Sequence, residues 1–190
     1  SGADLAGVTA QYNDYGTHWM NLSPATTDAN GNASIELFPS VNNFHFRAWK
    51  NYTSQEGDLV ITTSGLTGTV EFQTALAQGF AKDCELGTGV SGIRIQFNDY
   101  GSHWMDLNPN STAGDGLASI ELFPGGPYNM KASTIYTSKT KSFTLAGPTT
   151  QVEFNPVRVS LNYAGTVKYN DYGTHWMTMN ANTYMFPGTY

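Results

Sequence analysis

The sequence has little charge and almost no cysteine. Only 13% of its 190 residues are Asp, Glu, Lys or Arg, and the single cysteine, Cys84, excludes an internal disulfide and makes a cysteine-based metal cluster implausible. With 9 basic against 15 acidic side chains, the chain lacks the clustered positive charge of nucleic-acid binders. No stretch approaches the roughly 20 continuous apolar residues of a membrane-spanning helix. The composition therefore argues against nucleic-acid partners and against a membrane span.

Catalytic signatures are also lacking, whereas core-forming residues are plentiful. No recognised catalytic motif appears, and no segment shows a helical apolar stripe with capping residues. Hydrophobic residues make up 39% of the chain and aromatic residues 13%, which is enough to bury a core. We therefore expect a folded, non-helical protein.

Internal repetition dominates what the sequence does contain. One block reads YNDYGTHWMNL at 12–22, FNDYGSHWMDL at 97–107 and YNDYGTHWMTM at 169–179. A second block follows each time, as ASIELFP at 33–39 and at 118–124, and as the looser TYMFPG at 183–188. A third block, TVEFQT at 69–74, returns as QVEFNP at 151–156. Blocks that recur in the same order indicate a tandem array of related units.

The blocks divide the chain into three copies. Copy one covers 1–76, copy two covers 77–156, and copy three is a partial repeat over 157–190. Copy one has only SGADLAG where copy three has VRVSLNYAG, so its leading strand is expected to be absent. Copy three stops at FPGTY, where the other copies continue. We infer that the chain starts inside one repeat and ends inside another, completed either by a longer protein or by neighbouring chains.

The alternation of side chains within each copy is typical of β-strands. Ile93, Ile95 and Phe97 alternate with polar residues, a period of two. The NDYG tetrapeptide, rich in residues that tolerate left-handed backbone angles, predicts a hairpin connection. Further strands are expected around 34–37 and 44–49, and two more between 53 and 74. Six or seven short antiparallel strands, each with one apolar face, predict an all-β chain of tandem small antiparallel β-sandwich repeats.

These blocks resemble a known family. The order T-D-x-N-G, S-I-E-L-F-P, an aromatic-rich strand and then V-E-F-Q-T is similar to immunoglobulin-like repeats of large, mostly bacterial, extracellular proteins, in the carboxypeptidase regulatory-like and collagen-adhesin B-type (prealbumin-like) group of sandwiches. The resemblance covers nearly the whole chain, but its motifs are structural turns and core strands. It implies stalks, spacers, adhesive modules or carbohydrate-binding accessories at the cell surface or outside the cell, without choosing among them.

Aromatic residues near the NDYG hairpin are the candidate contact residues. By strand parity, Trp19 lies opposite Met20, and the Met/Leu side is expected to face the core. The indoles would then lie outside as anchors for a neighbouring unit or chain, or as platforms for sugar rings, unless a bulge turns them inward as core. The candidate ligand or interface residues are Tyr15, Trp19, Trp49, Tyr100, Trp104, Tyr172 and Trp176.

Metal and catalytic sites are not expected. His18, His103 and His175 each have one nearby Asp, which is too few ligands for zinc, and each lies in a different copy. Asp28, Asn30 and Asn32 resemble the start of a calcium loop, but copy two lacks the matching ligands, so a tight turn is the favoured interpretation. Acid/base catalysis needs a close carboxyl pair, and none is evident. We therefore expect no enzyme activity, no cofactor and no metal.

Two functions remain. The first is an extracellular structural or adhesive protein, secreted or on the cell surface, whose tandem sandwiches form a stalk, sheath or filament. Its partners would be other copies of the chain or neighbouring repeats of a longer chain. Strand donation between chains would complete the unfinished sandwiches. The second is a carbohydrate-binding accessory module that presents Trp and Tyr side chains to a polysaccharide. Whether the tryptophans are exposed, buried in their own unit or covered by a neighbour distinguishes these interpretations.

Overall fold

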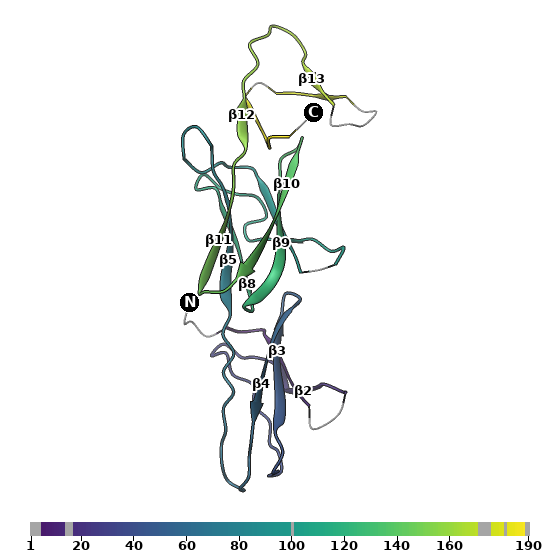
Figure 1. Ribbon diagram of the computed structural model, residues 1–190, viewed down its shortest axis with the longest axis vertical. Helices are drawn as coiled ribbons and strands as arrows, with labels where there is room; N and C mark the ends of the chain where they lie inside the picture. Colours follow the sequence, from purple (N-terminus) through teal and green to yellow (C-terminus); the bar gives the residue numbers. More distant parts are fainter. Residues whose placement is uncertain (1–4, 14–16, 100, 171–175, 181, 189–190) are drawn as a thin grey trace. The chain divides into compact units, whose positions relative to one another are not determined.

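The fold was analysed in a computed structural model, which describes residues 5–13, 17–99, 101–170, 176–180 and 182–188 (Figure 1). The described residues form an all-β, sandwich-like fold of short antiparallel strands, and none of them forms a helix able to cross a membrane. Two compact units divide the chain. Unit 1 comprises Ser1–Leu76 with Glu121–Pro124, and unit 2 comprises Ala77–Ile120 with Gly125–Tyr190.

Unit 1 is built on one four-stranded antiparallel sheet. Its strands, in the spatial order β2-β1-β3-β4, are β2 (Met20–Thr26), β1 (Thr9–Asn13), β3 (Phe44–Lys50) and β4 (Thr53–Leu59). β1 pairs with β2 across the NDYG segment, with Tyr12 opposite Met20, as the hairpin prediction requires. On β3 the predicted inner residues Phe44 and Ala48 are buried, while His45 is exposed and its Nδ1 contacts the Asp58 carboxyl group across the strand pair.

The second layer of unit 1 contains irregular backbone where strands were predicted. Residues 69–74 form no strand, and the 34–37 segment contributes a single bridge between Ser34 and Ser23. In unit 2 the corresponding segments flank a central strand, β5, and hydrogen-bond to it from both sides. No described segment of unit 1 occupies that central position, so the two flanking segments have no ladder to join. The prediction of strands there was therefore wrong.

Unit 2 contains two larger sheets. One has the order β10-β9-β6-β7, from β10 (Ser138–Leu145), β9 (Gly125–Ser133), β6 (Arg94–Asn98) and β7 (Met105–Asp106). The other has the order β11-β5-β8, from β11 (Thr149–Phe154), β5 (Ala75–Ala81) and β8 (Leu117–Leu122). The first residues of β5 and the last of β8 are counted with unit 1.

A glycine lets the two sheets of unit 2 approach closely. A Cβ built on Gly79 of β5 would lie 2.6 Å from Ile95 Cγ2 on β6 and 2.9 Å from the sulfur of Met130 on β9. Both neighbours are fully buried, so a side chain at Gly79 has no room. The core of unit 2 therefore lies between these sheets, where the alternation of Ile95 and Phe97 predicted it.

Two short strand pairs follow in the C-terminal part of unit 2. β12 (Val157–Val159) pairs with β15 (Thr183–Met185), and β13 (Lys168–Tyr169) pairs with β14 (Met177–Thr178). β13 and β14 flank the third NDYG segment, with Tyr169 opposite Met177. Their hydrophobic cluster contains Tyr169 and Met185 together with Tyr136 from the β9–β10 turn.

Candidate functional site

Two of the candidate tryptophans are half-buried beneath a cation. The Arg47 guanidinium lies 4.4 Å from the ring centroid of Trp19, and Lys131 Nζ lies 4.3 Å from that of Trp104. The cation comes each time from the strand two positions across the sheet, β3 in unit 1 and β9 in unit 2. A cation over an indole face, with its alkyl stem along the ring, covers apolar surface and is attracted by the ring quadrupole. These two rings are packed within their own units.

The expected division between an inner methionine face and an outer tryptophan face holds only in part. Leu22 and Leu107, on the methionine face, are buried as predicted. Met20 is 39% exposed, contrary to the prediction. The reason is its position on edge strand β2 of unit 1, where a regular second sheet is missing.

The remaining described candidates lie at the surface. Trp176 is 63% exposed, and Trp49 is exposed next to Tyr52, with the two rings edge-on at a centroid distance of 6.1 Å. Tyr15, Tyr100 and Tyr172 lie outside the described residues. The structure therefore gathers no common aromatic patch from the described candidates: it gives two cation-covered rings, one exposed Trp–Tyr pair and one exposed indole.

The possible metal ligands do not assemble. The described residues contain no group of three or more His, Cys, Asp or Glu side chains that could hold a metal ion, and His175 lies outside them. Asp28 Oδ1 accepts hydrogen bonds of 2.9 Å from the backbone N–H groups of Asn30 and Asn32. These bonds, that of Asn32 first, hold the pKa of Asp28 below its ordinary value. The residues proposed for a calcium loop thus form the tight turn favoured by the sequence.

A different site emerges from a repeated Phe-Pro segment that the sequence analysis treated only as part of a core strand. Phe123, which directly follows β8, is 1% exposed and packs with Val8 and Ala48 in the core of unit 1. Its backbone N–H donates to Thr53 Oγ1 over 2.9 Å, and Thr53 Oγ1 donates to the Lys50 carbonyl over 2.9 Å. A buried threonine hydroxyl at the β3–β4 hairpin thus receives the segment.

The hairpin itself is shaped for this contact. Asn51 and Tyr52 are its two central residues, with φ of 50° and 63°. Positive φ at both positions defines the type I′ turn that suits a two-residue hairpin, and such a conformation is costly for a tyrosine. The Asn51 side-chain amide then donates to the Glu121 carbonyl over 2.9 Å. The turn therefore presents two side chains to segment 121–124.

An equivalent contact occurs inside unit 2. Phe186, directly after β15, is 2% exposed, and its N–H donates to Thr137 Oγ1 over 2.7 Å. Its ring lies edge-on to Phe154 of β11 at 6.3 Å. Thr137 ends the β9–β10 turn, as Thr53 ends the β3–β4 turn, and both belong to the Y-T-S tripeptide of their copies. We call each pairing of a Phe-Pro segment with a Y-T-S turn a joint.

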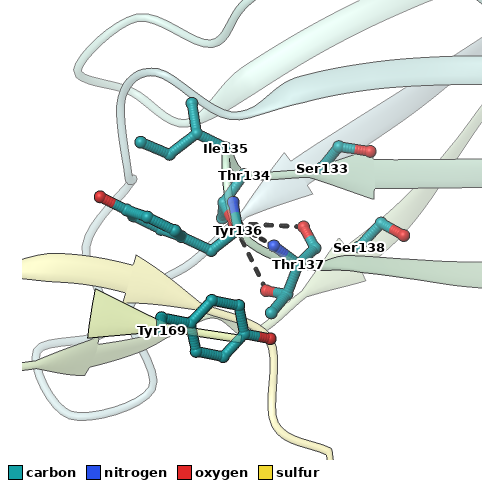
Figure 2. Close-up of a pocket in the computed structure, with 7 residues that line it drawn as sticks. All are labelled: Ser133, Thr134, Ile135, Tyr136, Thr137, Ser138 and Tyr169. Atoms are coloured by element: carbon teal, nitrogen blue, oxygen red, sulfur yellow. Dashed lines mark hydrogen bonds between the residues drawn. The ribbon is translucent and has the colours of Figure 1, made fainter. Parts of the chain in front are cut away.

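The residues of the β9–β10 turn, which carries Thr137, also line a surface pocket (Figure 2). Its walls are Ser133–Ser138 and Tyr169. Thr134 Oγ1 accepts hydrogen bonds from the N–H groups of Tyr136 and Thr137, which fixes the turn. Tyr136 and Tyr169 pack edge-on at 5.9 Å, and the Tyr136 hydroxyl donates to the Thr178 carbonyl over 3.3 Å. The pocket therefore lies beside the second joint and lacks any gathered catalytic groups.

A buried carboxylate supports the strand that leads into the second joint. Asp83, at 2% exposure, accepts hydrogen bonds from the N–H groups of Leu86 and Glu85 and from the Tyr184 hydroxyl, the last over 2.8 Å. The Leu86 N–H, then the Tyr184 hydroxyl, hold the Asp83 pKa below its ordinary value. Tyr184 belongs to β15, so this carboxylate positions the residues just before Phe186.

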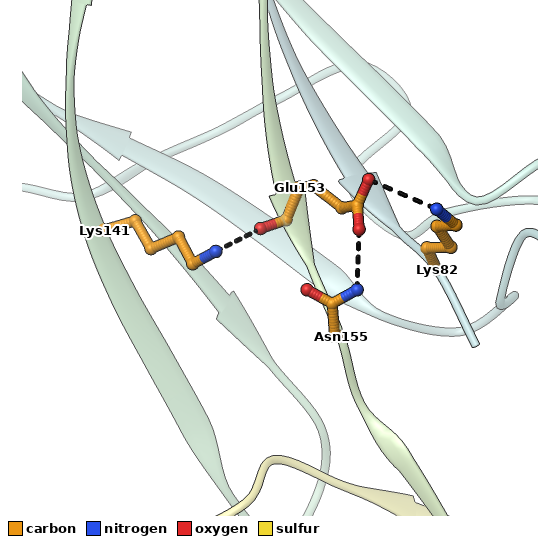
Figure 3. A network of polar contacts seen from close by, with 4 residues as sticks. All are labelled: Lys82, Lys141, Glu153 and Asn155. Atoms are coloured by element: carbon orange, nitrogen blue, oxygen red, sulfur yellow. Dashed lines mark hydrogen bonds and ion pairs between the residues drawn. The ribbon is translucent and has the colours of Figure 1, made fainter. Parts of the chain in front are cut away.

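A second polar network connects the edges of the two unit 2 sheets (Figure 3). Asn155 Nδ2 donates to Glu153 Oε1 over 2.7 Å, and Lys82 Nζ lies 3.6 Å from Glu153 Oε2. From the other sheet, Lys141 Nζ donates to the Glu153 carbonyl over 2.7 Å. The Asn155 amide and then the Lys82 charge lower the pKa of Glu153. These groups are partly exposed, so the network contributes little energy but joins β10 to β11.

Comparisons with known proteins find similar solved structures. No protein-family description matches the chain, and no curated protein matches it. The chain is similar to the TIE protein of Bacillus anthracis, with 14% identity and a TM-score of 0.38 over 96% of this chain, which spans 40% of that protein. It is also similar to the minor pilin of Streptococcus agalactiae, with 13% identity and a TM-score of 0.32 over 87% of this chain and 88% of that one.

Proposed function

We propose that this chain is an extracellular structural or adhesive protein, in which β-sandwich repeats are joined in series to form a stalk, sheath or filament. The observation that carries the proposal is the joint, which occurs twice with the same parts. In each case an apolar side chain following a strand is buried, and its N–H donates to the threonine of the turn from the preceding copy.

The joints connect the copies in a fixed order, because each joint has an inserting side and a receiving side. Copy two contributes the inserted segment to the first joint, through Phe123, and the receiving turn to the second, through Thr137. A contact between two different parts of the same kind of repeat is heterologous, and repetition of such a contact builds a linear array unless it closes into a ring. Serial repetition is the geometry that a stalk or filament needs.

Strand donation from a neighbouring repeat or chain is part of the proposal. An incomplete sandwich exposes strand edges, which are templates for another strand. In copies one and two, the strand before the NDYG segment pairs with β3 or β9. A donated strand that resembles β3 or β9 would supply the same pairing.

Immunogold electron microscopy of the source cells and of the secreted material tests the proposal. We expect antibodies against this chain to label fibres, stalks or a sheath outside the cell, with a regular spacing along them. Label confined to the cell interior, or spread over particles with no periodic structure, would contradict it.

Carbohydrate binding is the second candidate, and the exposed Trp49–Tyr52 pair favours it. Exposed aromatic rings stack on sugar C–H faces, and large apolar surface groups mark contact sites. The variant Trp49→Ala should lose retention on an insoluble polysaccharide while keeping its stability, with the half-buried Trp104→Ala as the matched control. Equal retention of both variants and the parent chain would exclude this candidate.

A further inference from the structure

The three Phe-Pro segments differ in one respect: the first is not buried. Phe38 is 93% exposed, whereas Phe123 and Phe186, the corresponding residues of the other copies, are 1% and 2% exposed. Val41, three residues further on, is 86% exposed as well. A phenylalanine at this exposure leaves its whole apolar surface in water, which is unusual for a large aromatic side chain. This apolar surface is therefore a candidate contact site.

Copy one prepares this segment in the same way as copy two. The heptapeptide ASIELFP is identical at 33–39 and 118–124. Its backbone is tied at the same point, because Ser34 bridges to Ser23 as Ser119 bridges to Asn108. The turn before it is also held alike. Thr27 Oγ1 donates to the Leu5 carbonyl over 2.6 Å, as Thr112 Oγ1 donates to the Val90 carbonyl over 2.6 Å. Copy one thus has both the sequence and the local anchoring of a docking segment, but no turn among the residues that the structure describes receives it.

We infer that Phe38 and Pro39 form a docking element for another β-sandwich repeat whose Y-T-S hairpin turn is unoccupied. This inference deepens the proposed function, on which it rests, by naming the partner surface. Both Y-T-S turns of this chain are already occupied, by Phe123 at Thr53 and by Phe186 at Thr137. The partner must therefore present a further turn of that chemistry: a threonine hydroxyl that accepts the Phe38 N–H, beside an open end of a sandwich core that buries the ring.

The full chain can be given a free turn by one substitution. Phe186→Pro removes from the second joint both the ring and the backbone N–H that donates to Thr137 Oγ1, so that Phe38 of another molecule can enter it. Sedimentation velocity should then show head-to-tail association, and the double variant Phe38→Ala/Phe186→Pro should associate about 100-fold more weakly, since burying a phenylalanine contributes about 3 kcal/mol. The parent chain and Phe38→Ala alone should remain alike. Equal association of the single and double variants, or none in either, overturns the inference.

A second measurement does not depend on the fold of Phe186→Pro. Benzoylphenylalanine placed at position 38 of the protein in its native setting changes an exposed side chain and leaves both joints intact. On irradiation we expect a cross-link to a peptide that contains a Y-T-S hairpin turn. Cross-links to other sequences, or none, overturn the inference.

The two proposals fail separately. If the immunogold label follows extracellular fibres but Phe38 forms no such cross-link, the serial array stands and its first docking element does not. If the cross-link forms but the label lies elsewhere, the docking chemistry stands and the extracellular role falls.

Discussion

The contribution of the first joint to the free energy of unfolding can be measured with an internal control, because the heptapeptides at 33–39 and 118–124 are identical. The substitution Phe→Ala at 123 removes a ring that is 1% exposed and packed with Val8, Ala48, Leu5 and Phe72. Truncation of a core phenylalanine costs about 3–5 kcal/mol. The same substitution at Phe38, which is 93% exposed, should change the free energy of unfolding by less than about 0.5 kcal/mol.

The two variants share their flanking sequence, so their effects on the denatured state largely cancel. Because the chain forms two units, one unfolding midpoint is a poor measure of the joint. Hydrogen exchange of the amides of β3, Phe44–Lys50, reports on unit 1 alone. A loss of about 3–5 kcal/mol should accelerate the exchange of the slowest of these amides by roughly 100- to 4,000-fold in Phe123→Ala.

Two results would refute the reasoning. If Phe38→Ala and Phe123→Ala accelerate exchange in β3 equally, burial at 123 contributes nothing specific to unit 1. If neither variant changes the exchange, the joint does not stabilise the unit that receives it.

Four other outcomes are expected. Thr53→Val keeps the shape of the turn but removes the acceptor of a buried N–H, and should cost about 1–3 kcal/mol by denaturant titration. Lys131→Ala uncovers Trp104, so the fluorescence emission should shift to the red, and an unchanged spectrum would contradict the stacking. Because the pKa of Asp83 is lowered in the folded protein, the ionised carboxylate stabilises the fold at pH values above its ordinary pKa of 3.8. This stabilisation is lost as the pH falls through the lower pKa of the folded state. The acid dependence of the melting temperature, measured at stepped pH, should therefore diminish in Asp83→Asn. Gly79→Ala places a methyl group between two packed sheets and should lower stability by about 1–3 kcal/mol, seen as a lower melting temperature.

The parts of the fold that depend on local chemistry were predictable from the sequence. The NDYG segments predicted hairpins, and each is flanked by paired strands because Asn, Asp and Gly suit tight turns. The alternation around Ile95 predicted the inner face of β6, because the two-residue period of a strand assigns side chains to opposite faces. These features need no information from distant residues.

Local sequence patterns could not reveal that residues 69–74 form no strand. A strand needs a hydrogen-bonding neighbour as well as an alternating pattern, and in unit 1 no described strand fills the central position that β5 occupies in unit 2. The same pattern, QVEF at 151–154, forms strand β11 because β5 lies next to it. Similar sequences therefore take different secondary structure.

The sequence by itself determined the repetition, the all-β class and the turns, because period and turn chemistry are local properties. Only the tertiary structure decided that Trp19 and Trp104 are covered by cations, and that Phe123 is buried while Phe38 is exposed. Two identical heptapeptides cannot differ through their own residues. They differ because burial depends on whether a receiving turn from another part of a chain, such as the one ending at Thr53, lies against them.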